Sequence, residues 1–253
     1  MIKGVFEVER ITILRTPNLE SSIRKAIQWF SSGTIFLDLP MDLERYIEDI
    51  AIGADYHEVL SYLEDVGLIR VEDRVKYRTL APLFEYIYMN QPDVHCYRDP
   101  LYHTISNETL REIFLMTARG RLGRIEIDEW RRVLEEDVRT EIEYAEIEGE
   151  FIRERASEEN VCLNASEEIE EYLRGKGFEV VRRDVDLSCT PLDMLRSMIR
   201  EEVLEGKMVP DETVRRLVEY HLRFTDLILE KGREEAYRMW KNFMGDWNDP
   251  TSS

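Results

Sequence analysis

The stretch DVHCYRDPLYH, residues 93–103, decides how this chain is expected to fold. Its first five residues have the composition of a short strand, and an amphipathic helix is expected to open at residues 107–109. Two of the chain's four histidines, together with Arg98 and Asp99, fall within nine residues at the end of that strand. Open α/β sheets bind ligands outside the carboxyl ends of their strands. The stretch is therefore the best candidate for a functional site.

Strands and helices alternate on both sides of this stretch. Strands are expected at residues 5–8, 11–14, 34–37, 161–163 and 178–181, and helices at residues 23–30, 43–50, 57–66 and 82–90. Asp42 is predicted to cap the second of these helices and Ser166 a later one, while residues 68–77 stay open between a hairpin and a charged loop. Because the strands are continuous apolar runs, the predicted fold class is α/β, with a mostly parallel central sheet flanked by helices.

The second half of the chain adds a long acidic helix and a helical C-terminal region. Residues 126–159 hold 14 acidic residues against five basic ones. One helical stripe carries their apolar side chains, namely Ile127, Trp130, Leu134, Val138, Ile142, Ala145, Ile152 and Ala156. One long helix or a broken pair is expected there, with Gly149 as the kink. The domain prediction is a single α/β domain over residues 1–245, a helical insert near 125–160, C-terminal helices at 190–243 (191–205 and 211–243), and a disordered tail at 246–253.

The charge balance excludes some classes of partner. A net charge of −19 disfavours attraction to nucleic acid or to an anionic membrane surface. No apolar run approaches the roughly 20 residues that a membrane-spanning helix needs. The expected partners are a small ligand or another protein, and a homo-oligomer is compatible with the sequence.

Cysteine usage predicts a cytoplasmic protein. The three cysteines have no CxxC spacing, and charged residues interrupt the N-terminal segment where a secretion signal would lie. Cys96 and Cys162 fall inside apolar strand runs, which predicts buried free thiols. Abundant Glu and Arg beside only two Gln suggest a thermophilic source.

Familiar catalytic signatures are absent from the sequence. There is no GxxxxGK phosphate loop, no GxGxxG after the first strand and no GxSxG elbow. His57 and Glu58 begin a string similar to HExxH, but Ser61 stands where the second histidine would be. His57 is therefore interpreted as a surface helix residue.

Four residues form the candidate catalytic set: Asp38, Arg98, Asp99 and His103. Asp38 ends an apolar strand, where a carboxylate can bind a metal or act as a base, although a turn residue before Pro40 is the simpler alternative. An arginine beside an aspartate can fix a ligand carboxylate or phosphate, or hold a turn as an ion pair. If the two strands are parallel neighbours, the side chains of Asp38, Arg98 and Asp99 face one crevice. His95 lies inside its strand and is either a packed histidine or a binding residue.

The order of five segments resembles a known superfamily. Residues 13–18, ILRTPN, stand where a first strand would run into a Gly-Thr-x-His turn, and FLDL at 36–39 matches a strand that ends in an acid. Residues 97–99 with 104–110 match an Asp-Arg turn and a threonine-containing helix start. EGEFIR at 148–153 matches an acidic and arginine helix motif before the strand at 161–165. Together they resemble the superfamily of TraB-type proteins, Tiki proteases, ChaN-like proteins and erythromycin esterase-like enzymes.

The resemblance covers about residues 11–181 and implies a metal-dependent hydrolase, yet the implied metal ligands are altered. Asn18 stands in place of the first ligand histidine, and Glu167 or Glu168 falls near the second. Asn18 and Glu150 are binding candidates on this basis, and a divalent metal is the one cofactor implied. Oxygen ligands suit a hard cation and would make a different site.

Two functional hypotheses follow. The favoured one is a non-catalytic or degenerate member that binds a small ligand or a partner protein, with the acidic helix at Glu135, Glu136 and Glu143 as the interface. The alternative is a metal-dependent hydrolase of a peptide or ester bond with an oxygen-rich metal site. In that enzyme Asp38 would be the metal ligand or base, and Arg98 would stabilise an oxyanion.

Overall fold

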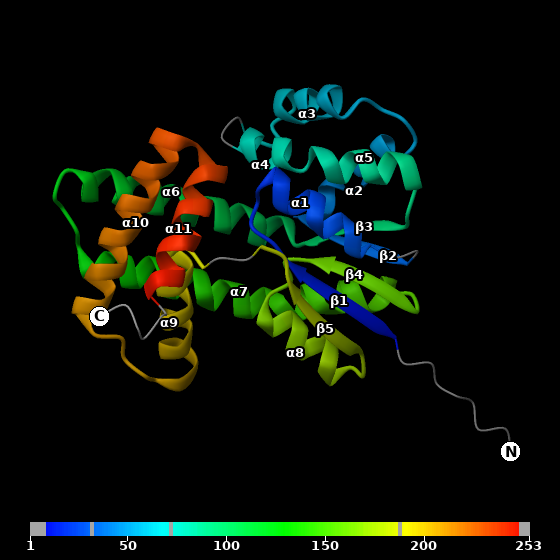
Figure 1. Ribbon diagram of the computed structural model, residues 1–253. Coiled ribbons are helices and arrows are strands. Elements are labelled where there is room, and N and C mark those ends of the chain that lie inside the picture. Colours follow the sequence, from blue (N-terminus) through cyan, green and yellow to red (C-terminus); the bar gives the residue numbers. More distant parts are fainter. Residues whose placement is uncertain (1–8, 31–32, 71–72, 187–188, 248–253) are drawn as a thin grey trace, which may run out of the picture. The chain divides into compact units, whose positions relative to one another are not determined.

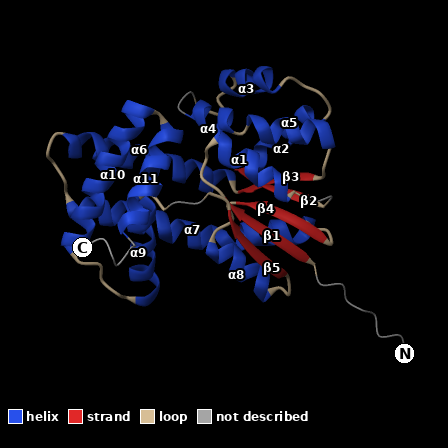
Figure 2. Cartoon of the chain, viewed as in Figure 1, coloured by secondary structure: helices blue, strands red, loops and turns tan. Residues whose placement is uncertain are grey.

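Five short strands form one sheet in which every neighbouring pair runs parallel (Figure 2). The computed structural model describes residues 9–30, 33–70, 73–186 and 189–247. The strands are β1 (Arg10–Arg15), β2 (Thr34–Pro40), β3 (Val94–Arg98), β4 (Glu159–Leu163) and β5 (Glu179–Asp184), in the order β3-β2-β4-β1-β5. The predicted α/β class with a parallel central sheet is confirmed. The strand expected at residues 5–8 and most of the expected tail lie outside the described residues.

Helices make the connections between the strands. They are α1 (Glu20–Ala26), α2 (Glu44–Ala51), α3 (Tyr56–Asp65), α4 (Arg74–Thr79), α5 (Ala81–Asn90), α6 (Pro100–Arg121), α7 (Ile127–Arg155), α8 (Glu167–Gly175), α9 (Pro191–Glu205), α10 (Asp211–Lys231) and α11 (Arg233–Trp247). Two 3-10 turns, η1 (Ile27–Trp29) and η2 (Met41–Leu43), follow α1 and precede α2. The long acidic helix is therefore one continuous element, α7.

The chain divides into two compact units. The first comprises Met1–His103 and Tyr144–Leu187 and contains the sheet. The second comprises Thr104–Glu143 and Ser188–Ser253, and its described residues form helices and connecting turns. Helices α6 and α7 each contribute residues to both units, so the insert predicted near residues 125–160 is shared between them.

Both faces of the sheet are covered, as the continuous apolar strands predicted. From β1 to β2 to β3 the chain moves in one direction along the sheet, and helices α1 to α5 cover one face (Figure 1). From β3 to β4 to β5 it moves in the opposite direction, and the end of α7 and α8 cover the other face. Right-handed crossovers require this change of face when the direction reverses. Leu14, Ile35 and Leu37 pack on the first face, and Ile13 and Phe36 on the second.

The reversal of direction places a crevice at the carboxyl ends of the central strands. β4 lies between β1 and β2, so the segments that leave β1 and β4 turn toward opposite edges of the sheet. Such a switch point leaves the strand ends uncovered, which is why open α/β sheets bind ligands there.

The second unit has its own core. Helices α9 and α10 enclose it together with residues of α6 and α7, and the buried side chains include Trp130, Leu134, Leu195 and Val214. Arg196 contributes a partly buried ion pair with Asp137 at 2.5 Å. This core gives the second unit a packing interior separate from the sheet.

Three local predictions outside the candidate site were wrong. Asp42 does not cap a helix, because it lies inside η2 and Leu43 is the residue before α2. Residues 74–77 belong to helix α4 rather than to a hairpin or loop. The helix expected over residues 211–243 is two helices, since Gly232 adopts a φ of 81° that ends α10. The cap at Ser166 is confirmed, with its side chain accepting from the Ile169 N–H.

Candidate functional site

Arg98, the last residue of β3, is the centre of a buried charge cluster in the first unit. Its Nε lies 2.5 Å from Asp38 Oδ1 and its Nη1 lies 2.8 Å from Glu148 Oε2. Nη2 donates to the Asn164 carbonyl at 3.4 Å. One planar guanidinium thus joins β2, α7 and the end of β4, a geometry that suits the fork of an arginine better than a lysine.

Asp38 reaches Arg98 because β2 is irregular at this point. β2 and β3 pair regularly up to Leu37 and Cys96, and the register shifts before Pro40 pairs with Arg98. Such a bulge redirects a side chain at the end of a strand. The Asp38 side chain is 26% exposed, so one side of its carboxylate borders solvent. Of the three side chains expected to face one crevice, Asp38 and Arg98 contact each other, whereas Asp99 Oδ1 accepts from the Leu101 N–H.

Glu148 is the site residue that the sequence analysis missed. It lies on α7 with its side chain 1% exposed, and its Oε1 accepts from the Asp99 N–H at 3.0 Å. Burial raises the pKa of Glu148 to about 7, against the opposing effects of the Arg98 charge and the Asp99 N–H. One signal could have revealed it: the apolar stripe of α7 skips from Ala145 to Ile152, and Glu148 occupies the skipped position.

Glu150, the binding candidate of the same motif, lies elsewhere. It is partly exposed, pairs with Arg153 at 2.5 Å and accepts from the Tyr172 hydroxyl. These two hydrogen bonds lower the pKa of Glu150 to about 2. The adjacent Gly149 does not interrupt α7; it lets the Tyr172 ring approach, since a Cβ there would lie 2.6 Å from Tyr172 Cδ1.

Asp99 and His103 belong to the start of α6, which begins at Pro100 rather than near residue 107. Asp99 Oδ1 accepts from the Leu101 N–H at 2.8 Å, so this carboxylate caps the helix. His103 lies in the first turn, and its N–H donates to the Asp99 carbonyl at 2.9 Å. Burial, followed by the charge of Lys76, lowers the pKa of His103 to about 4, and the imidazole is neutral at pH 7.

His95 is turned toward the edge of the sheet. Its Nδ1 lies 3.1 Å from Glu44 Oε1 and its Nε2 lies 3.6 Å from Asp93 Oδ1. Glu44 also accepts from the Cys96 N–H at 2.9 Å, so α2 begins with a carboxylate that covers part of edge strand β3. His95 also packs against the rings of Phe36 and Phe151, so these contacts lie outside the Arg98 cluster.

Two asparagines lie where the chain leaves the central strands. Asn18 follows β1, and its Oδ1 accepts from the Thr79 hydroxyl. Asn164 follows β4 with a φ of 53°, and its Oδ1 accepts from the Thr16 N–H at 2.8 Å. Asn164 was not among the predicted site residues. Like Asp38, however, it lies at the carboxyl end of an apolar strand, where open α/β sheets bind ligands.

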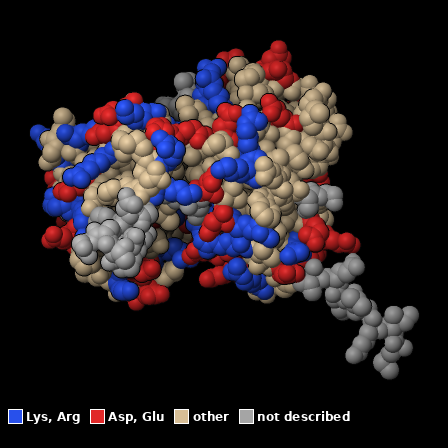
Figure 3. Space-filling view, viewed as in Figure 1, with Lys and Arg blue, Asp and Glu red and all other residues tan. Residues whose placement is uncertain are grey.

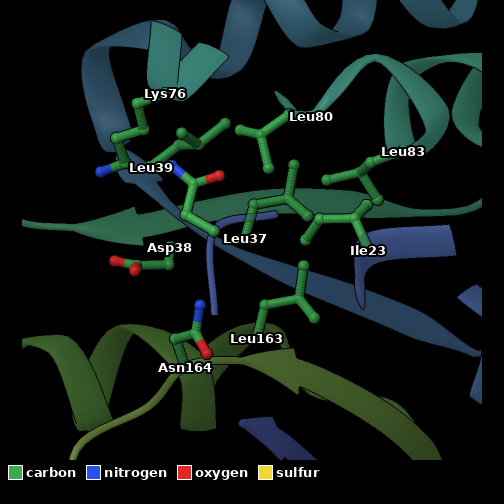
Figure 4. Close-up of a pocket in the computed structure, with 10 residues that line it drawn as sticks. Ile23, Leu37, Asp38, Leu39, Lys76, Leu80, Leu83, Leu163 and Asn164 are labelled. Atoms are coloured by element: carbon green, nitrogen blue, oxygen red, sulfur yellow. The ribbon is translucent and has the colours of Figure 1, made fainter. Parts of the chain in front are cut away.

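A small pocket opens beside Asp38. Its volume is about 50 Å³. Asn18, Asp38, Lys76 and Asn164 provide its polar lining, and Ile23, Leu37, Leu39, Leu80, Leu83 and Leu163 its apolar lining. In Figure 4 the polar groups of Asp38, Lys76 and Asn164 lie on one side and Leu80, Leu83 and Ile23 on the other. A ligand with one polar end and one apolar end would match this division.

The donor set at this edge does not fit a divalent metal. Within the described ranges, no group of three or more His, Cys, Asp and Glu side chains is arranged to hold a metal ion. The two carboxylates of the cluster, Asp38 and Glu148, both bond to Arg98, whose positive charge opposes a second cation. Glu167, a possible substitute for the second ligand histidine, pairs with Arg182 at 3.0 Å.

The acidic face of α7 is partly balanced by neighbouring arginines. Glu135 pairs with Arg139 at 2.6 Å, and Glu136 pairs with Arg132 at 2.9 Å. Figure 3 likewise shows basic side chains interspersed with acidic ones on the visible face of the molecule. Among the helices that the structure describes, none combines the length and apolar character needed to cross a membrane.

Comparisons with known protein families, with curated proteins and with solved structures each find no match to this chain.

Proposed function

We propose that this protein binds a small ligand without transforming it, in the pocket at the carboxyl ends of β1, β2 and β4. One observation carries the proposal: Asp38 and Glu148, which could perform chemistry, both bond to Arg98, whereas the adjacent pocket has a polar side and an apolar side. Buried ion networks of this kind fix a structure, and apolar pockets with few polar groups bind ligands.

The size of the pocket limits the ligand. Drug-sized ligands occupy roughly 300 to 1,000 Å³. A cavity of about 50 Å³ has room for only a few water molecules or for a short organic molecule. The proposed ligand is therefore much smaller than a drug-sized molecule.

The alternative, a metal-dependent hydrolase, has weaker support. It needs Asp38 as a metal ligand or base, but Asp38 Oδ1 lies 2.5 Å from Arg98 Nε. It also needs further ligands, and the nearest amides, Asn18 and Asn164, use their oxygens to accept hydrogen bonds from Thr79 and Thr16. For these reasons we propose a divergent, non-catalytic member of the TraB, Tiki, ChaN and erythromycin esterase-like superfamily.

The cellular setting and the protein partners are part of the same proposal. Cys96 and Cys162 are buried free thiols, as their apolar strand positions predict, and Cys189 is exposed. Free thiols are typical of a reducing compartment, so we propose a cytoplasmic protein. Because Glu135 and Glu136 already have arginine partners, an acidic docking face on α7 has less support than the pocket.

Native mass spectrometry of protein purified without chelator or metal affinity resin tests the proposal. The wild type should retain a small molecule or acquire one from a fragment mixture. Leu80→Phe, which fills the pocket, should abolish that binding. Leu60→Phe is the matched control, because Leu60 is equally buried in the same core but does not line the pocket.

Two results would contradict the proposal. Binding that survives Leu80→Phe in a folded protein would place the ligand elsewhere. A stoichiometric divalent ion that disappears in Asp38→Ala would support the hydrolase instead.

A further inference from the structure

Asn164 directs a hydrogen-bond donor into the pocket. Its own N–H donates to the Leu14 carbonyl at 2.9 Å, and its Oδ1 accepts from the Thr16 N–H at 2.8 Å. A backbone N–H can only donate, so the oxygen and nitrogen of this amide are assigned without ambiguity. In Figure 4 the amide nitrogen of Asn164 lies on the side toward Leu37 and Asp38. Among the described residues this nitrogen has no hydrogen-bond acceptor.

Lys76 supplies a cation on the same polar side. It lies on α4, is half-buried, and forms no ion pair within the described part of the chain. Other cations of the first unit differ: Lys25 pairs with Asp186 at 2.5 Å, and Arg24 pairs with Glu20 at 2.8 Å. A half-buried ammonium without a counterion is unfavourable, so an anion in the pocket would improve its environment.

The remaining charges around the pocket leave the charge of Lys76 uncompensated. Asp38 is balanced by Arg98 at 2.5 Å, and His103 is neutral at pH 7. Glu148 is buried behind Arg98 and bonds to it. The polar side of the pocket therefore offers two donors, Lys76 and the Asn164 amide, and the Asp38 carboxylate on the same side is paired with Arg98 (Figure 4).

We propose that the pocket binds a short aliphatic carboxylic acid, whose carboxylate contacts Lys76 and Asn164 and whose chain packs on Leu80 and Leu83. This inference rests on the proposed function and specifies its ligand. Two donors match the two oxygens of a carboxylate, whereas a phosphate group requires more donors than this lining provides. A short branched chain suits the limited volume of about 50 Å³.

The carboxylate could belong to a simple acid or to an α-amino acid. Asp38 Oδ2 accepts no hydrogen bond from the described residues, and the carboxylate borders the pocket. An ammonium group on the ligand could bind there. A simple acid and an α-amino acid share the carboxylate and the aliphatic chain. The affinities of isovalerate and valine therefore distinguish the two kinds of ligand.

Methyl-labelled protein observed by NMR tests the inference. Isovalerate, valine, 3-methylbutan-1-ol and 3-methylbutan-1-amine are titrated separately, and the methyl signals of Leu80, Leu83 and Leu163 are followed. Isovalerate or valine should bind at least about tenfold more tightly than the alcohol or the amine. The alcohol and the amine lack the carboxylate that accepts a charge-assisted hydrogen bond.

Two substitutions locate the carboxylate. Lys76→Met and Asn164→Asp should each weaken the binding of isovalerate by about tenfold. Asn164→Asp keeps an oxygen for the Thr16 N–H and a residue type that tolerates the φ of 53°. Lys176→Met is the control, because Lys176 lies against the Tyr172 ring at the end of α8 and does not line the pocket. The methyl spectra and thermal unfolding of each variant verify that it is folded.

The outcomes separate the two proposals. Equal binding of the acid and the alcohol, or tighter binding of the amine, would overturn the carboxylate inference and leave the proposed binding function intact. If none of the four compounds shifts the pocket methyls and the fragment mixture also yields no ligand that Leu80→Phe removes, both proposals fail. Valine binding more tightly than isovalerate would identify an α-amino acid, and the reverse would identify a simple acid.

Discussion

Arg98 and Glu148 form an ion pair in which the Nη1 to Oε2 distance is 2.8 Å and the glutamate side chain is 1% exposed. The two residues come from the end of β3 and from the last third of the long helix α7. Their contact therefore ties the sheet to the helix that covers its second face. Replacement of Arg98 leaves the buried Glu148 carboxyl without its counter-charge, which is far more costly than the loss of an exposed pair.

Replacement of Arg98 should destabilise the first unit strongly. Arg98→Met removes the counter-charge of both Asp38 and Glu148, and we expect a loss of about 3 to 5 kcal/mol in the free energy of unfolding. Urea denaturation measures this loss. Arg24→Met is the control, because Arg24 pairs with Glu20 at an exposed position and should cost less than about 1 kcal/mol. Similar losses in the two variants would contradict the central role of Arg98.

Glu148 should make stability fall as the pH rises. Its pKa is about 7 in the folded protein, above the ordinary value of 4.5, so the folded state binds the proton more tightly than the unfolded state. The contribution of Glu148 to the free energy of unfolding is fully present below about pH 4.5 and is lost as the pH rises through 7. Glu148→Gln cannot titrate, so its stability relative to the wild type should improve between pH 5 and pH 8. If the difference in the free energy of unfolding between Glu148→Gln and the wild type does not change with pH, Glu148 has an ordinary pKa.

His103 should act in the opposite direction. Its pKa is lowered from 6.5 to about 4, so the unfolded state binds the proton more tightly, and stability from this group is lost as the pH falls from 6.5 toward 4. Because Lys76 is the second cause of the shift, Lys76→Met should raise the pKa of His103 in an NMR titration. His221 is the internal control, since burial and Arg121 lower its pKa to about 4. Equal pKa changes at His103 and His221 in Lys76→Met would indicate a general effect of the substitution rather than the loss of a nearby charge.

Gly149 should not tolerate a side chain. An added Cβ would lie 2.6 Å from Tyr172 Cδ1, so Gly149→Ala should displace the Tyr172 ring and cost about 1 to 3 kcal/mol. Gly175 offers the contrasting case on α8, because nothing lies within 4 Å of its added Cβ. Gly175→Ala should be neutral or stabilising by up to about 1 kcal/mol. Thermal unfolding of the two variants checks the prediction, and a stable Gly149→Ala protein would refute it.

The sequence predicted the strands and the crevice better than it predicted the chemistry inside it. Continuous apolar runs located the parallel sheet, and their ends located Asp38 and Arg98. Glu148 was missed because a periodic pattern of apolar residues marks the buried face of a helix but does not reveal a buried charge within it. Lys76 was missed because residues 74–77 carry little helical periodicity, and their helix is stabilised by the packing of Tyr77 in the core. Tertiary contacts override weak local preference in such short helices.

The position of β4 between β1 and β2 has a consequence for the order in which the chain can fold. Strand β1 forms ladders only with β4 and β5 among the described strands, and Arg10 pairs with Glu159. During synthesis β2 and β3 can pair early, but β1 has to wait until most of the first unit has emerged from the ribosome. Contacts between such distant segments make folding slow. The edges of β1 and β2 that later pair with β4 are consequently left with unpaired backbone N–H and C=O groups in the nascent chain until β4 inserts between them and completes the sheet.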